Sequence, residues 1–251
     1  MKLLWRCALT VVAVAGPVAA WGADIQVLTA GAYKPVITAL QADFERQTGH
    51  RLIVQNDTAG ALQRRIGGGE AFDVVVATPA VLEQLATAGK VPGSPTRLAR
   101  VAIGVAVKTG SPAPDIATTA SFQAALLSAR AIATIDPVAG GSSGIYLWQL
   151  FEKMGIADRL KPTAVLVPGG LVAERVVNGQ ADIAIHQISE ILAVPGVTLV
   201  GPIPAEIQNY TVYAGSVSAS AANPGAARAL LDALAGAGAR AVLQSRGMEA
   251  P

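Results

Sequence analysis

Five loops rich in glycine and small polar residues carry the side chains of this sequence that could do chemistry. They are Thr29 to Pro35, Asn56 to Gly60, Ala77 to Pro79, Asp136 to Gly144 and Val167 to Leu171. Each loop precedes a segment with helical periodicity, and the free N–H groups of a helix N-terminus bind anions without needing many cations. One such loop alone is compatible with an ordinary turn. Five together predict an anion-binding site.

The candidate ligand-binding residues lie in these loops and at the end of one apolar strand. They are Gly31, Ala32, Tyr33, Lys34, Thr58, Ala59, Thr78, Ser142, Ser143, Gly144, Gly169, Gly170, His186 and Gln187. The fourth loop is the most specific, because two hydroxyls between glycines exceed what a turn requires. The chain has two histidines. We expect His50 to be exposed, whereas His186 is either a ligand contact or a plain strand-end residue.

Several kinds of catalytic site are absent from the sequence. It contains no P-loop, no G-x-S-x-G nucleophile turn, no H-E-x-x-H zinc motif and no dinucleotide fingerprint. The single cysteine, Cys7, lies in the N-terminal segment described next. Disulfides, thiolate metal sites and cysteine nucleophiles are therefore excluded from the rest of the chain, and we expect neither a metal ion nor a cofactor.

Residues 1–23 have the features of a secretory signal peptide. Lys2 and Arg6 precede an apolar stretch from Cys7 to Val14, and small residues follow. The stretch is too short for a membrane span, which needs about 20 apolar residues. Cleavage is expected between about Ala20 and Ala23. Arg6 is charged where a lipid-attachment site would have a small residue before Cys7, which argues against lipidation.

Removal of this segment makes the chain formally neutral. The 19 basic residues of the full chain fall to 17 with the loss of Lys2 and Arg6, equal to the 17 acidic residues. No basic surface for nucleic acid is expected. The affinity for an anion must then come from helix N-termini, hydroxyls and a few local cations.

From Asp24 onward, short β-branched runs alternate with amphipathic helical segments. The expected strands are 25–28, 52–55, 72–77, 101–107, 131–135, 164–167, 182–186, 197–200 and 208–213. The expected helices are 35–47, 59–66, 79–88, 121–128, 143–154, 171–178, 187–192, 224–234 and 237–246. This alternation predicts an α/β protein with parallel sheets covered on both faces.

Two segments lack a helix between strands, at 101–115 and at 206–213. If the chain crosses there, it builds two lobes. The first would comprise residues 24–104 with 212–251, and the second residues 105–211. A length of 251 residues with 52% apolar content can fill both cores. We expect the ligand in the cleft between the lobes, at the carboxyl ends of the strands.

Five runs of the sequence resemble the periplasmic molybdate-binding protein family, the substrate-binding subunits of ABC importers. They are IQVLTAGAYKPVITAL, DTAGALQRRI, FDVVVATPA, IDPVAGGSSGIYLWQLFEKMG and ADIAIHQISEI, and the resemblance extends from Ile25 to about Gly247. It implies a type II periplasmic binding fold of two α/β lobes joined by a two-segment hinge. It also implies a periplasmic monomer that binds a small anion and delivers it to a membrane permease.

The binding residues of that family are only partly present. The resemblance places its two loop serines on Ala32 and Ala59, with Thr58 adjacent to the second, and its tyrosine on Gln187. Each lost charge-assisted hydrogen bond is worth about 1.5–3 kcal/mol. The cations near these loops suit an organic carboxylate better than molybdate, although arginines on helices are commonly solvated. They are Lys34, Arg64, Arg65 and Arg175.

The leading hypothesis is a solute-binding protein for a small, carboxylate-bearing anion. The alternative is an isomerase, because the sequence also resembles secreted aconitate isomerases, which move a double bond in an unsaturated tricarboxylate. In that case His186 is the candidate base, Tyr33 or Tyr146 its proton partner, and Lys34 holds a carboxylate. A sensory or partner-presenting module is the third hypothesis.

Overall fold

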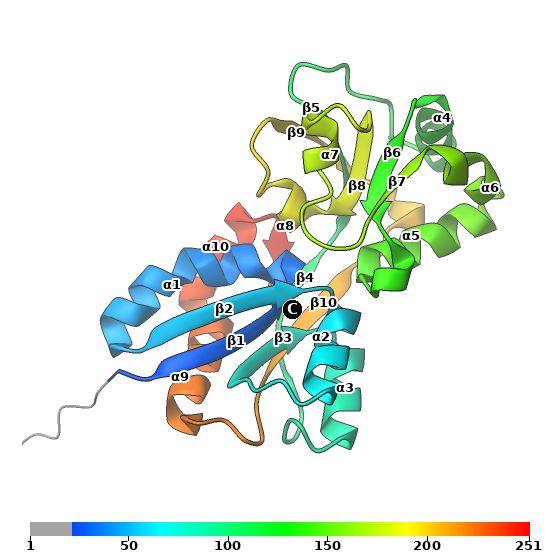
Figure 1. Ribbon diagram of the computed structural model, residues 1–251. Helices are drawn as coiled ribbons and strands as arrows, with labels where there is room; N and C mark the ends of the chain where they lie inside the picture. Colours follow the sequence, from blue (N-terminus) through cyan, green and yellow to red (C-terminus); the bar gives the residue numbers. More distant parts are fainter. Residues whose placement is uncertain (1–21) are drawn as a thin grey trace, which may run out of the picture.

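The computed structural model describes residues 22–251, and the chain forms two sheets, each covered by helices (Figure 1). The predicted signal peptide lies outside the described residues except for its last two. No helix between residues 22 and 251 is long and apolar enough to cross a membrane.

The first sheet has six strands in the order β11-β4-β10-β3-β1-β2. The strands are β1 (Asp24–Ala30), β2 (Arg51–Asp57), β3 (Val74–Ala77), β4 (Thr96–Val101), β10 (Thr211–Val217) and β11 (Met248–Glu249). Strands β2, β1 and β3 are parallel, whereas β10 runs antiparallel to β3 and β4. We call the part of the chain built on this sheet the first lobe.

Helices pack on both faces of the first sheet because successive side chains of a strand point in opposite directions. Val27 packs into a core with α1 (Lys34–Thr48), α9 (Pro224–Ala235) and α10 (Ala237–Ser245). Its neighbour Leu28 packs into the opposite core with α2 (Ala59–Gly67) and α3 (Pro79–Thr87). Figure 1 shows these two groups of helices on either side of the sheet. A short 3₁₀ turn, η1 (Gly31–Tyr33), leads from β1 into α1.

The second sheet has five strands in the order β7-β6-β8-β5-β9, and the part of the chain built on it is the second lobe. Its strands are β5 (Ile103–Lys108), β6 (Ile132–Ile135), β7 (Ala164–Val167), β8 (Ile183–Gln187) and β9 (Val197–Pro202). Its helices are α4 (Thr119–Ser128), α5 (Ser142–Lys153), α6 (Ala157–Leu160), α7 (Glu174–Val177) and α8 (Ile188–Ile191). The 3₁₀ turns are η2 (Pro137–Ala139), η3 (Lys161–Thr163) and η4 (Ala205–Ile207).

The chain passes between the two sheets twice, and these passages correct two predictions. The expected strand 101–107 corresponds to β5, which begins at Ile103 in the second sheet, whereas Val101 is the last residue of β4, a strand of the first sheet that was not expected. The expectation of parallel sheets was also wrong. Both sheets are mixed. Strands β5 and β10 each enter their sheet directly from the other lobe, without the helical crossover that a parallel neighbour needs, and each pairs antiparallel. The predicted lobe boundaries stay a prediction.

Local sequence signals placed most helix ends correctly. Pro35 and Pro79 lie in the first turns of α1 and α3, and Gly49 ends α1 in the left-handed conformation with φ of 73°. The expected helix 171–178 is shorter, since α7 begins at Glu174. His50 is half-buried rather than exposed, because its Nδ1 accepts a hydrogen bond from the Ala23 N–H at 3.1 Å.

Candidate functional site

A small cavity of about 30 Å³ lies where the two lobes meet. The ends of β1 and β2 supply one side of it, and the β6–α5 loop, the end of β8 and α8 supply the other. Its lining consists of Ala30, Gly31, Ala32, Asn56, Asp57, Thr58, Ala59, Ile135, Gly141, Ser142, Ser143, Gly170, His186, Gln187, Glu190 and Tyr213. A cavity of this size holds little more than a water molecule.

The structure brings most of the candidate residues together here. Nine of them line the small cavity: Gly31, Ala32, Thr58, Ala59, Ser142, Ser143, Gly170, His186 and Gln187. Lys34 and Gly169 line a second cavity beside it, which also includes Gly31 and Gly170. Tyr33, Thr78 and Gly144 line neither cavity. Thr78 occupies the N-cap position of α3, but its side chain makes no capping hydrogen bond.

Two helix N-termini face the small cavity from opposite lobes. Helix α2 begins at Ala59 in the first lobe, and helix α5 begins at Ser142 in the second. The first N–H groups of a helix have no partner within the helix and carry a partial positive charge. The arrangement therefore suits an anion held between the lobes.

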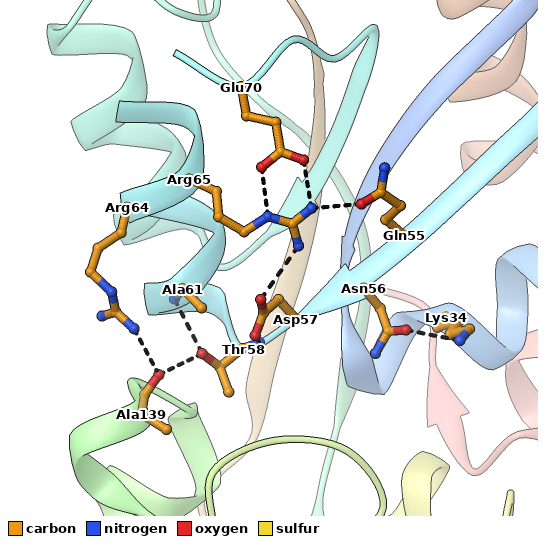
Figure 2. A network of polar contacts seen from close by, with 10 residues as sticks. All are labelled: Lys34, Gln55, Asn56, Asp57, Thr58, Ala61, Arg64, Arg65, Glu70 and Ala139. Atoms are coloured by element: carbon orange, nitrogen blue, oxygen red, sulfur yellow. Dashed lines mark hydrogen bonds and ion pairs between the residues drawn. The ribbon is translucent and has the colours of Figure 1, made fainter. Parts of the chain in front are cut away.

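The hydroxyl of Thr58 already has partners. Its Oγ accepts a hydrogen bond from the Ala61 N–H at 3.1 Å and donates to the carbonyl oxygen of Ala139 at 2.5 Å (Figure 2). Ala139 belongs to the second lobe, so this bond links the lobes. A threonine has one hydroxyl proton. In this arrangement Thr58 therefore has no proton left to donate to a ligand.

Two arginines near the cavity have other partners. Arg65 donates through Nε to Glu70 at 2.6 Å, and its two terminal nitrogens contact Gln55 and Asp57 (Figure 2). These bonds fix Arg65 within the first lobe and offset the charge of Asp57. Arg64 is exposed, and its Nη2 lies 3.5 Å from the Ala139 carbonyl oxygen. Neither side chain lines the small cavity or the second cavity beside it.

A buried histidine–glutamate pair forms one wall of the small cavity. His186 Nδ1 lies 3.3 Å from Glu190 Oε2, and their side chains are 3% and 9% exposed. The geometry is not that of a hydrogen bond, so Nδ1 has no hydrogen-bond partner. Burial lowers the pKa of His186 to about 3 and raises the pKa of Glu190 to about 8.

These shifts determine the charge of the pair at neutral pH. With both shifts the imidazole is neutral and the carboxyl keeps its proton, so the pair contributes no net charge. An ionised Glu190 would repel an anion in the same cavity, whereas a protonated one can donate a hydrogen bond to it. The pair also offers one group that accepts a proton and one that gives a proton, side by side.

Gln187 connects the cavity to the strand that returns from the second lobe. Its Nε2 donates to Thr211 Oγ1 at 2.8 Å and lies 3.3 Å from Ser142 Oγ. Its own Oε1 is buried without a hydrogen-bond partner. A buried acceptor without a partner is costly and marks a place where a donor from a ligand would be stabilised.

The tyrosines of the site differ from those expected. Tyr213 lines the cavity, and its ring lies 6.4 Å from the fully buried ring of Tyr33. Burial raises the pKa of both phenols. The Tyr146 hydroxyl instead donates to the Ile207 carbonyl oxygen at 2.7 Å, away from the cavity. Of the two tyrosines expected as proton partners of His186, Tyr146 is therefore not placed for that role.

Helix α8 holds Glu190 against the first loop of the other lobe. Ser189 Oγ donates to the Ala32 carbonyl oxygen at 2.8 Å, and both residues are buried. A Cβ on Gly31 would lie 2.5 Å from Glu190 Oε1. Gly31 is thus required for the carboxyl of Glu190 to enter this space.

Sequence reasoning missed Glu190 and Tyr213. Glu190 had a readable signal, since an acid four residues after His186 within an apolar run lies close to it at a strand-to-helix turn. Tyr213 had none, because its place in the cavity depends on the return of β10 from the second lobe.

Comparison with known proteins agrees with this geometry. The profile of the family described as bacterial extracellular solute-binding protein matches residues 25–249. The chain belongs to this family. A solute-binding protein of this kind with two lobes and a central site was expected from the sequence, and both the family and the type II periplasmic binding fold are confirmed.

One relative of this solute-binding protein and two solved structures of similar fold are informative. A protein from Pseudomonas sp named aconitate isomerase is 32% identical over 232 residues, which cover 90% of this chain and 87% of that protein. The periplasmic molybdate-binding protein of Azotobacter vinelandii has a TM-score of 0.77 at 21% identity, covering 90% of this chain and 99% of its own. The sulfate-binding protein SubI of Mycobacterium tuberculosis H37Rv has a TM-score of 0.73 at 18% identity, covering 91% and 87%.

Proposed function

We propose that this solute-binding protein is an isomerase that binds an unsaturated polycarboxylate between its lobes and shifts a double bond by proton transfer. The observation that carries this proposal is the buried pair of His186 and Glu190 in the wall of the anion cavity. The relative named aconitate isomerase, 32% identical over most of both chains, supports the same reaction class.

An organic carboxylate fits the lining better than molybdate does. The positions of the two loop serines carry Ala32 and Ala59, whose side chains cannot donate hydrogen bonds. Glu190 adds a carboxyl group that repels any anion once it ionises, so its charge favours neither ligand class. A protonated carboxyl is a suitable partner for a substrate carboxylate.

The reaction requires one proton to leave and one to return. A base takes a proton from the methylene carbon next to a carboxylate, the C–H electron pair becomes the new double bond, and the old double bond takes a proton at its far carbon. Atoms and electrons balance without an oxidant or reductant. Neutral His186 is the proposed base and protonated Glu190 the proposed acid. Burial makes His186 a weak base by itself, so it takes a proton as the adjoining Glu190 gives one up, which leaves a buried ion pair without net charge.

The decisive experiment is incubation of the purified mature protein with cis-aconitate, followed by proton NMR. We expect trans-aconitate to accumulate, and His186→Gln and Glu190→Gln to slow its formation by about 100-fold or more, as for loss of a general acid or base. Glu206→Gln, at an exposed acid outside both cavities, is the control. Tight binding of cis-aconitate without any turnover would contradict the isomerase.

A second candidate is a binding protein that delivers a small anion to an ABC-importer permease. The family match supports it, as do the two-lobed fold and the predicted signal peptide, which together favour a periplasmic monomer that closes by hinge motion. Thermal shifts with molybdate, tungstate, sulfate, and di- and tricarboxylates test the ligand class. Stabilisation by molybdate alone would contradict the organic-anion proposal.

A further inference from the structure

A second and much larger cavity adjoins the first. Its volume is about 510 Å³, and it shares Gly31, Asn56, Gly170 and Glu190 with the small cavity. Ligand pockets for small organic molecules typically have volumes of about 300–1,000 Å³. A tricarboxylate cannot fit in the small cavity alone, so a ligand that reaches His186 must extend past Glu190 into the larger one.

The larger cavity concentrates positive charge. Lys34, Arg175 and Arg246 line it, opposed by Glu174 and by Glu190, whose raised pKa keeps it largely protonated at neutral pH. The charge of this cavity is therefore positive in a mature chain that is formally neutral overall. A local surplus of positive charge attracts anions, and dissolved salt screens it only weakly where the charged groups are partly buried.

The two arginines have unused hydrogen-bonding capacity. The Nε atoms of Arg175 and Arg246 are buried and have no hydrogen-bond partner. Within residues 22–251 neither side chain forms an ion pair, and Arg175 makes one side-chain bond, from Nη1 to Gln180 at 3.1 Å. A buried donor left unpaired is costly, and a carboxylate satisfies the planar fork of a guanidinium with two oxygens.

The cations come from both lobes. Lys34 begins α1 and Arg246 follows α10 in the first lobe, whereas Arg175 lies on α7 in the second. Lys34 Nζ donates to Asn56 Oδ1 at 2.8 Å, and Asn56 lines both cavities (Figure 2). An anion held by Arg175 and Arg246 therefore contacts both lobes at once.

We propose that the larger cavity binds the non-reacting carboxylates of the ligand through Arg175 and Arg246, and that it makes the protein selective for tricarboxylates over monocarboxylates. The inference rests on the proposed function, because it takes the reacting carbons to lie at His186 and Glu190.

Binding of tricarballylate, a saturated tricarboxylate that cannot isomerise, tests the cavity separately from the reaction. Titration calorimetry should show affinity falling from tricarballylate to glutarate to acetate. Arg175→Gln and Arg246→Gln should each weaken tricarballylate binding by about tenfold or more, the effect of losing a charge-assisted hydrogen bond. Arg240→Gln is the matched control, an exposed arginine on α10 outside the cavity.

A variant that is expected to strengthen binding distinguishes the loss of a ligand contact from a folding defect. Glu174→Gln removes a negative charge from the cavity and should strengthen tricarballylate binding. Equal affinity for the three acids, or unchanged affinity in the double arginine variant, would overturn the inference. Arginine-dependent binding of tricarballylate without turnover of cis-aconitate would support the role of the larger cavity and contradict the isomerase proposal. Turnover with an unchanged KM in the double arginine variant would support the isomerase and contradict the role of the larger cavity.

Discussion

Gly60 and Gly140 join the two lobes backbone to backbone. The Gly60 N–H, at the start of α2, donates to the Gly140 carbonyl oxygen at 3.1 Å. A Cβ added to Gly60 would lie 3.0 Å from the Cα of Gly140. Contacts this short require one backbone to shift, so the close approach of the lobes depends on the absence of a side chain at Gly60.

The substitution Gly60→Ala should therefore weaken ligand binding without harming the fold. Alanine favours the first turn of a helix more than glycine does. The added methyl should cost about 1–3 kcal/mol only when the lobes meet. We expect an unchanged or higher melting temperature without ligand, and a dissociation constant raised about tenfold or more by calorimetry. Gly67→Ala is the control on the same helix, where a Cβ meets nothing within 4 Å. Equal binding by the two variants would contradict the role of Gly60.

Anion affinity should fall as the pH rises through about 8. Burial raises the pKa of Glu190 to about 8, so its carboxyl is protonated below that pH and negative above it. A negative Glu190 repels an anion in either cavity. Titration with tricarballylate between pH 6 and 10 measures the change, and Glu190→Gln should bind with little dependence on pH in this range. The same pH dependence in Glu190→Gln would assign the titration to another group.

The contribution of His186 to the stability of the fold should fall as the pH drops from about 6.5 to about 3. Burial lowers the pKa of His186 to about 3, so in this range the unfolded chain binds a proton that the folded protein does not. This contribution to the free energy of unfolding rises with pH and is fully present above about 6.5. Glu190, whose pKa is raised from 4.5 to about 8, contributes a slope of opposite sign between those two values. Urea unfolding at several pH values measures the slope. His186→Gln should reduce it, and an equal slope in this variant would contradict the buried neutral imidazole.

The Arg65 network should stabilise the first lobe modestly. Its ion pairs with Glu70 and Asp57 are about one-third exposed, so Arg65→Ala should lower the free energy of unfolding by about 0.5–1 kcal/mol. Tricarballylate affinity should stay within twofold of wild type, because the guanidinium bonds within its own lobe. A large loss of affinity would instead indicate that Arg65 contributes to ligand binding.

The sequence was sufficient to predict most of the secondary structure and the loops of the site. Periodicity and helix-end signals such as Pro35 and Gly49 are local, so they are readable without the fold. The expected strand 101–107 failed for the converse reason. Its division at Ala102 between two sheets depends on which strands pair, and pairing is a non-local choice.

The same distinction between local and non-local features applies to the site. The amino-acid types alone led to the prediction that an anion is held by helix N-termini and a few cations, since no motif for other chemistry is present and the charges of the mature chain balance. The tertiary structure decided which polar groups remain available. It committed Thr58 and Arg65 to other partners and buried Glu190 beside His186, where low solvent access changes their protonation. Such desolvation and pairing arise when the lobes meet, so the order of residues along the chain does not reveal them.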